Sequence, residues 1–156
     1  MKKILLLSVS SLALLLSACS SSTTNKSATN QPKYSQINTA EYKPINESIS
    51  TKKLKQLKPN NTKYFHKKYS IKGEVVKVGK KFQGSATYVI KDLKTKLTYA
   101  SVTSGTKTFN GFKVGDKATF AINGLTRIAK KNNLNGLTTK DNPSRLSTVT
   151  IAIGKY

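Results

Sequence analysis

The 156-residue chain has little of the chemistry that most enzymes and metal sites require. It holds one cysteine, one histidine and no tryptophan, which excludes a disulfide framework and a zinc site built from several Cys and His ligands. Acidic residues are also scarce: six Asp and Glu stand against 28 Lys and Arg, for a formal net charge of +22. So few carboxylates leave little material for acid–base catalysis.

Arginine is nearly absent, since Arg127 and Arg145 are the two arginines and the remaining cations are lysines. Lysine acts as a point charge and lacks the planar fork with which arginine reads bases. Any binding of nucleic acid is therefore expected to be insensitive to base sequence. The length and a hydrophobic share of 37% fit one folded domain.

The N-terminus has the pattern of a secretory signal peptide over residues 1–18. Lys2 and Lys3 precede an apolar run from Ile4 to Leu16 that is interrupted by serines. The run is shorter than the ~20 apolar residues that span a bilayer. We therefore expect a cleaved leader.

The residues that follow the apolar run are Leu16-Ser17-Ala18-Cys19. This motif resembles the lipobox of bacterial lipoproteins. The resemblance implies that Cys19 carries a diacylglyceryl group and becomes the first residue after cleavage, which anchors the protein on the extracytoplasmic face of the cell membrane. The alternative is an ordinary signal peptide with an incidental cysteine. Cleavage removes Lys2 and Lys3, which lowers the formal charge from +22 to +20.

Composition divides the remaining chain into a linker and a folded part. Residues 19–48 are rich in Ser, Thr and Asn, and such a segment is expected to form a disordered tether with an r.m.s. reach of roughly 30 Å. The folded domain is expected over residues 49–156. It begins with a short capped helix over residues 50–57, which Pro59 ends.

Alternating apolar residues predict five short strands after this helix. The first strand carries apolar residues on one side up to Gly73 and then at Val76 and Val78, which predicts a bend at the glycine. No long helix is indicated, and the pattern favours an all-β fold, a small barrel. The expected strands are Lys68–Lys80, Ser85–Lys91, Leu97–Thr103, Lys117–Asn123 and Thr148–Ile153.

The bent strand Tyr-Ser-Ile-Lys-Gly-Glu-Val-Val-Lys-Val (residues 69–78) and the later Phe-Lys-Val-Gly-Asp-Lys-Ala-Thr-Phe (residues 112–120) resemble the OB-fold. The resemblance implies a five-stranded OB-like barrel. It departs from the common plan where a loop at residues 104–111 replaces the helix between the third and fourth strands. An SH3-like barrel is the alternative.

Ligands of OB-folds usually lie across the second and third strands, between the loops after the first and fourth. Here those loops are residues 79–84 and 127–145. Lysines there would attract phosphates, and aromatic rings would stack on bases for ~1–3 kcal/mol each. The candidate ligand-binding residues are Lys80, Lys81, Phe82, Tyr88, Tyr99, Arg127, Lys130, Lys131, Lys140 and Arg145.

Other interpretations of these residues stay open. Tyr88 has the same parity as Ala86 and Ile90, which favours a place in the core, while Tyr99 and Phe82 fit either role. The lysine excess fits a solvated surface as well as a polyanion-binding one.

The sequence favours a binding function without catalysis or a cofactor. Asp92 and Asp116 have the positions of turn residues, and His66 has no acid or nucleophile near it in sequence. We therefore expect a cell-envelope lipoprotein that binds polyanions electrostatically, either nucleic acid or an anionic wall polymer such as teichoic acid. The alternative is a protein-interaction or envelope-structural module without a polyanion ligand.

Overall fold

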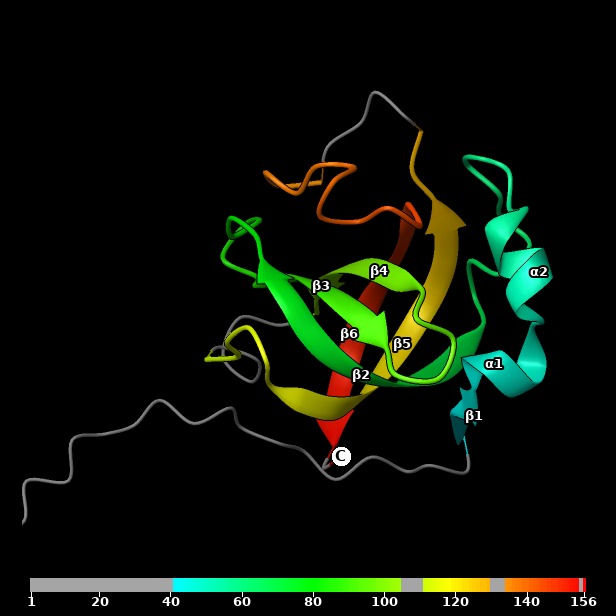
Figure 1. The fold of residues 1–156 in the computed structure, drawn as a ribbon, viewed down its shortest axis with the longest axis horizontal. Helices are drawn as coiled ribbons and strands as arrows, with labels where there is room; N and C mark the ends of the chain where they lie inside the picture. Colours follow the sequence, from blue (N-terminus) through cyan, green and yellow to red (C-terminus); the bar gives the residue numbers. More distant parts are fainter. Residues whose placement is uncertain (1–40, 105–110, 130–133, 155) are drawn as a thin grey trace, which may run out of the picture.

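Five strands form a closed barrel in the computed structural model, which describes residues 41–104, 111–129, 134–154 and 156. The order around the barrel is β2-β3-β4-β6-β5, and β5 pairs back onto β2 (Figure 1). All pairs are antiparallel except β4–β6. The expectation of a small all-β barrel is confirmed. The strands are β2 (Lys68–Val78), β3 (Thr87–Asp92), β4 (Thr98–Thr103), β5 (Lys117–Arg127) and β6 (Leu146–Gly154).

The long strand β2 closes the barrel because it pairs with β5 through its first half and with β3 through its second half. Gly73 belongs to both pairings, opposite Ala118 on one side and Asp92 on the other. A Cβ at this position would lie 2.4 Å from Cγ2 of Ile90, so only glycine fits without rearrangement.

The change of face in β2 occurs after Gly73, which corrects the predicted position. Tyr69, Ile71 and Val75 all point into the core, and the register shifts between Val75 and Lys77. This bulge turns Val76 to the outside of the barrel, where it packs on a second, smaller apolar cluster.

A short N-terminal unit precedes the barrel and lies beside β2 and β5 (Figure 1). It consists of β1 (Lys43–Pro44), which pairs in parallel with β2, then α1 (Ile45–Ser48) and α2 (Thr51–Lys55). The hydroxyl of Ser50 accepts a hydrogen bond from the backbone N–H of Lys53, which is the expected helix cap. The folded unit therefore includes residues 43–48, which the sequence had assigned to the linker.

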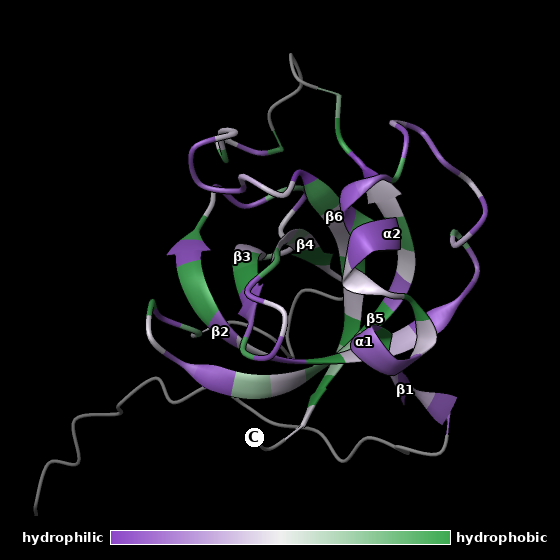
Figure 2. Ribbon diagram, turned by 45° about the vertical axis from the view of Figure 1, so that its right-hand side comes forward, coloured by the Kyte–Doolittle hydropathy of each residue, from purple (hydrophilic) through white to green (hydrophobic). Residues whose placement is uncertain are grey.

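The barrel core continues into this N-terminal unit. Ile45 and Leu54 are fully buried in the same cluster as Tyr99 and Phe120. Figure 2 shows the ribbon of α2 coloured mainly as hydrophilic. The two helices are thus held by apolar side chains that join the core, while their charged side chains remain in solvent.

Several sequence predictions lie outside the described residues. They are the signal peptide, the lipidation of Cys19, most of the tether and the greater part of the loop at residues 104–111. Within the part of the chain that the structure describes, no helix is long and apolar enough to cross a bilayer.

Candidate ligand-binding surface

The loop between β5 and β6 covers the outer face of β3 and β4, where an OB-fold would usually bind its ligand. Leu137 from this loop is 3% exposed and packs on Val89 and Ala100, which are opposite each other on the two strands. The strand face that the OB-fold resemblance implied for ligand binding is therefore filled by the chain itself.

Buried polar contacts fix this loop to the sheet. The side-chain amide of Asn142 donates to the carbonyl of Leu146 at 2.8 Å, and its Oδ1 accepts from the hydroxyl of Thr98 at 2.8 Å. At the other end, Nδ2 of Asn135 donates to Oγ1 of Thr87 at 3.2 Å. These contacts attach both ends of residues 134–145 to the barrel.

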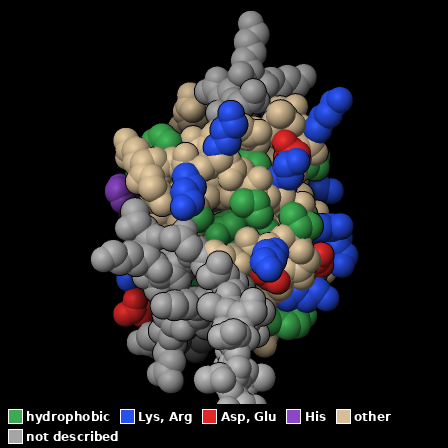
Figure 3. Space-filling model, turned by 90° about the vertical axis from the view of Figure 1, so that its left-hand side faces the viewer, with side chains coloured by type: hydrophobic (Ala, Val, Ile, Leu, Met, Phe, Trp, Pro, Cys, Tyr) green, Lys and Arg blue, Asp and Glu red, His purple; other side chains and the backbone are tan. Residues whose placement is uncertain are grey.

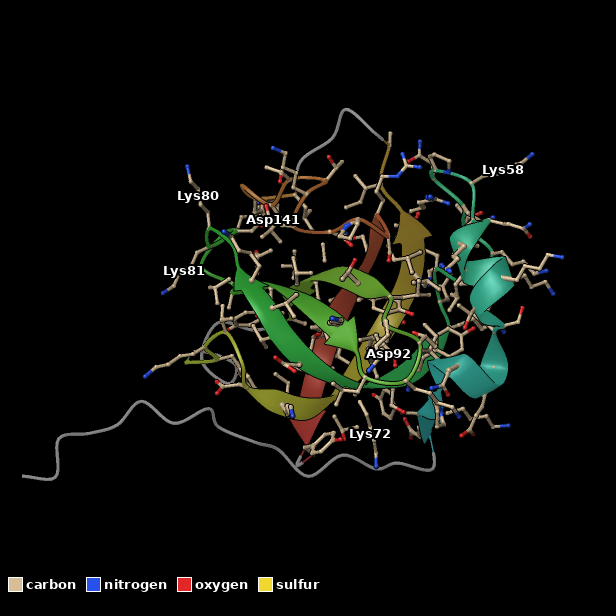
Figure 4. All side chains as sticks on the ribbon, in the orientation of Figure 1. Lys58, Lys72, Lys80, Lys81, Asp92 and Asp141 are labelled. Atoms are coloured by element: carbon tan, nitrogen blue, oxygen red, sulfur yellow. The ribbon has the colours of Figure 1, made fainter. Side chains whose placement is uncertain are left out.

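The β2–β3 loop folds back in a tight turn that exposes three of the candidate residues. Phe82 and Ser85 exchange backbone hydrogen bonds of 2.9 and 2.8 Å, while Gln83 and Gly84 between them have positive φ angles. Phe82 is 45% exposed, and Lys80 and Lys81 project from the loop into solvent (Figure 4).

The two loops meet at this end of the barrel. The backbone N–H of Lys80 donates to the carbonyl of Asn135 at 2.9 Å, and the ammonium of Lys77 lies 3.6 Å from a carboxylate oxygen of Asp141. Hydrogen bonds from the backbone and hydroxyl of Thr138 hold the pKa of Asp141 below its ordinary value. Lys140, the neighbour of Asp141, is exposed.

The end formed by these loops has apolar side chains near its centre and lysines or arginines around them (Figure 3). Val78 and Phe82 are the large apolar side chains exposed here, beside a shallow hollow of ≈ 290 Å³. Lys80, Lys81, Phe82 and Lys140 therefore share one side of the barrel, as the resemblance implied, although the strand face between the loops is covered.

Tyr88 and Tyr99 are core residues, which corrects their place among the ligand-binding candidates. Tyr99 is fully buried and Tyr88 is 2% exposed, with its ring 5.9 Å from that of Phe112. Burial raises the pKa of both phenols. Neither ring presents a face on which a base could stack.

Arg127 has a structural role that sequence reasoning did not foresee. Its Nη1 donates to the carbonyls of Lys55 and Leu57, at and just beyond the end of α2, and so links this helix to β5. Burial, together with the nearby charge of Arg145, lowers the pKa of Arg127. Arg145 is half-buried and adopts a positive φ of 54° at the end of the loop. Lys130 and Lys131 lie outside the described residues.

Asp92 and Asp116 both bind backbone N–H groups of turns. Oδ1 of Asp92 accepts from the backbone N–H groups of Lys94 and Thr95, and Oδ2 of Asp116 accepts from that of Lys113. The predicted turn roles of the two aspartates are therefore confirmed. Among the described residues, no group of three or more His, Cys, Asp or Glu side chains could hold a metal ion.

A second basic region, which sequence reasoning did not single out, lies on the other side of the barrel. We call residues 51–72 the basic segment; it holds eight lysines and no acidic residue. Within it, Phe65 is the most exposed ring, at 54%, and its neighbours His66 and Lys67 are also exposed. The signal that would have found this region is a Phe within a lysine-rich run. The lysines are Lys52, Lys53, Lys55, Lys58, Lys63, Lys67, Lys68 and Lys72.

Comparisons with protein-family models, with curated proteins and with solved structures find no significant match to this chain.

Proposed function

We propose that this chain is a lipid-anchored protein of the cell envelope whose barrel binds anionic polymers by electrostatic attraction, without catalysis. The observation that carries the proposal is the charge balance of the folded part. The described residues hold twenty Lys and Arg but six Asp and Glu, so at least fourteen cations have no carboxylate of their own. A surface with such an excess attracts polyanions over a Debye length of about 8–10 Å.

The form of the surface supports binding that is insensitive to the sequence of the polymer. Arg127 is engaged by backbone carbonyls, and the lysines lack the geometry for bidentate contacts to bases. The covered face of β3 and β4 also removes the strand surface on which an OB-fold usually arranges its ligand. Attraction between lysines and phosphates is the interaction that remains.

A salt titration tests the proposal. The chain from residue 19 onward, with Cys19→Ser so that it carries no lipid, is titrated with single-stranded DNA and with polyglycerol phosphate. We expect both polymers to bind at low salt, and each lysine engaged by single-stranded DNA should add about 0.7 to the slope of log K against log salt. Absence of binding at low salt would reject the proposal and leave the interaction module as the better function.

The lipid anchor is tested separately in cells. Two acyl chains on Cys19 would hold the protein on the membrane stably, whereas the rest of the chain depends on charge. We expect Cys19→Ala to release the protein from washed membranes. Full retention of the variant would mean that the anchor is not the main attachment.

A further inference from the structure

The loop that leads into β2 carries an exposed aromatic ring on a rigid support. We call residues 62–67 the Phe65 loop. This loop is joined to β5 where Gly124 interrupts the pairing of β5 with β6. The backbone N–H of Gly124 donates to the carbonyl of Lys67, and the backbone N–H of Leu125 donates to the carbonyl of Tyr64. Gly124 has a φ of +66°, and a Cβ there would lie 2.7 Å from the carbonyl oxygen of Phe65. Only glycine lets the loop approach β5 this closely.

Beside Phe65, the outer surface of β4, β5 and β6 carries apolar side chains among polar ones such as Asn123 and Ser147. A hollow of ≈ 440 Å³ lies beside the ring, with Val102, Val149 and Ile151 among the residues that line it. Phe65 is 54% exposed and Val149 is 42% exposed. An exposed apolar patch of this kind, next to a polar rim, marks a surface that contacts another apolar phase or a partner.

The rim beside this patch is basic. The Phe65 loop contains Lys63 and Lys67, and it follows α2, whose Lys52, Lys53 and Lys55 lie in its last turn. The backbone N–H of Asn60 donates to the carbonyl of Arg127, so the chain between α2 and the loop also runs along β5. The chain that runs along β5 therefore joins an exposed phenyl ring beside a partly apolar hollow to the lysines of the Phe65 loop and of α2.

We propose that the side of the molecule that carries the Phe65 loop rests on the anionic outer leaflet of the membrane that holds the lipid anchor, with Phe65 in the headgroup region and the lysines among the lipid phosphates. The proposal rests on the proposed function and names the membrane surface as one of its polyanions. Lysines near an anionic leaflet each strengthen association by roughly fivefold, and an aromatic ring is well suited to the interfacial region.

The short distance in sequence between Cys19 and the barrel favours the membrane leaflet over a soluble polymer as the partner of this side. Residues 20–40 separate Cys19 from the described chain, and 21 residues span at most roughly 70–75 Å even when fully extended. The chain enters the barrel at β1, next to α1 and α2, on the side that carries the basic segment (Figure 1). A tether this short keeps the leaflet at a high effective concentration, so a weak contact is enough to orient the barrel.

The β2–β3 loop provides a matched control, because it also places an exposed phenylalanine beside two lysines. Lys80 and Lys81 lie on the opposite side of the barrel from Lys58 of the basic segment (Figure 4), and Phe82 follows Lys81 in the same exposed loop. The chain contains no tryptophan, so Phe65→Trp and Phe82→Trp each introduce a single fluorescent reporter. Both substitutions are at exposed positions and should leave the fold intact.

The experiment uses residues 19–156 with Cys19→Ser and vesicles of phosphatidylglycerol, with phosphatidylcholine vesicles for comparison. We expect the emission of the Phe65→Trp variant to shift to the blue with phosphatidylglycerol only, and the emission of the Phe82→Trp variant to stay unchanged. Lys63→Gln with Lys67→Gln should weaken vesicle binding roughly 10- to 30-fold, whereas Lys80→Gln with Lys81→Gln, which removes the same charge, should weaken it less than twofold.

The outcomes separate this inference from the proposed function. Equal shifts in both tryptophan variants, or a shift in the Phe82→Trp variant alone, would overturn the proposed orientation. Binding of single-stranded DNA and polyglycerol phosphate without binding of phosphatidylglycerol vesicles would overturn the membrane contact while the proposed function stands. If single-stranded DNA quenches the emission of the Phe65→Trp variant and vesicles do not bind, the site belongs to nucleic acid instead.

Discussion

Two outer faces of the same barrel differ in what covers them. The β3–β4 face carries Val89 and Ala100 and is covered by Leu137 of the chain's own loop. The face beside Phe65 and Val149 is also apolar, yet among the described residues it keeps a hollow open to solvent. An OB-like barrel can therefore lose its usual ligand face to internal packing, and the exposed apolar surface elsewhere then becomes the better guide to function.

The largest expected change in stability comes from removing the side chain of Leu137, which covers the β3–β4 face. Leu137→Ala removes most of a buried side chain, and we expect a loss of about 2–4 kcal/mol in the free energy of unfolding. Leu134→Ala is the control, because Leu134 belongs to the same cluster but is only half-buried. Denaturation by urea measures both variants. A loss for Leu137→Ala no larger than that of the control would show that the loop is not fixed to the sheet.

A substitution at Gly124 tests the close approach of the Phe65 loop to β5. Gly124→Ala must adopt a positive φ and also displace the carbonyl of Phe65, so we expect a loss of about 1–3 kcal/mol. Gly115→Ala is the matched control, since Gly115 has a φ of +96° with open space around its Cα. Urea denaturation should give a smaller loss for the control; equal losses would mean that the close approach of the Phe65 loop contributes nothing.

The link between α2 and β5 is expected to have an intermediate effect. Arg127→Met keeps much of the apolar stem but removes the donors to Lys55 and Leu57, which should cost about 1–2 kcal/mol. The affinity for anionic polymers should fall little, because this guanidinium is engaged within the fold. A large loss of polymer affinity with unchanged stability would instead mean that Arg127 binds the ligand.

The smallest effect concerns Asp141 and depends on pH. Its pKa in the folded protein lies below its ordinary value of 3.8, chiefly because of the hydrogen bonds from Thr138. The carboxylate therefore contributes its stabilisation above pH 3.8 and loses it as the pH falls toward the folded-state pKa. Asp141→Asn should flatten this part of the acid unfolding curve; an unchanged curve would contradict the role of the Thr138 contacts.

The sequence predicted the barrel well because its strands follow local patterns. Alternation located all five strands, and Gly115 and Asp92 marked turns through their own backbone and side-chain preferences. β5 extends beyond the predicted end to Arg127, because the bulge at Gly124 lets the pairing with β6 resume after the glycine. A glycine in a strand pattern suggests that the strand ends there, and only the pairing with β6 shows that β5 continues after Gly124.

The candidate site was predicted less well because exposure depends on contacts far apart in the chain. Parity along the strand favours a core position for Tyr88, whereas the burial of Tyr99 follows from its pairing with Ile90 on the neighbouring strand. The engagement of Arg127 joins residues at least seventy positions apart. No local pattern indicates that Leu137 covers Val89, since this contact depends on the path of an irregular loop.

The pairing of β1 with β2 also has a mechanical consequence. In the lipid-anchored protein that we propose, a pull along the tether first reaches the ion pair between Glu41 and Lys68 and then β1, which lies parallel to Tyr69 and Ser70. Behind β1, Ile45 is 1% exposed and would have to leave the core before α1 could unravel. Drag on a bound envelope polymer would therefore load this ion pair, the two-residue strand and this single isoleucine before the five strands of the barrel.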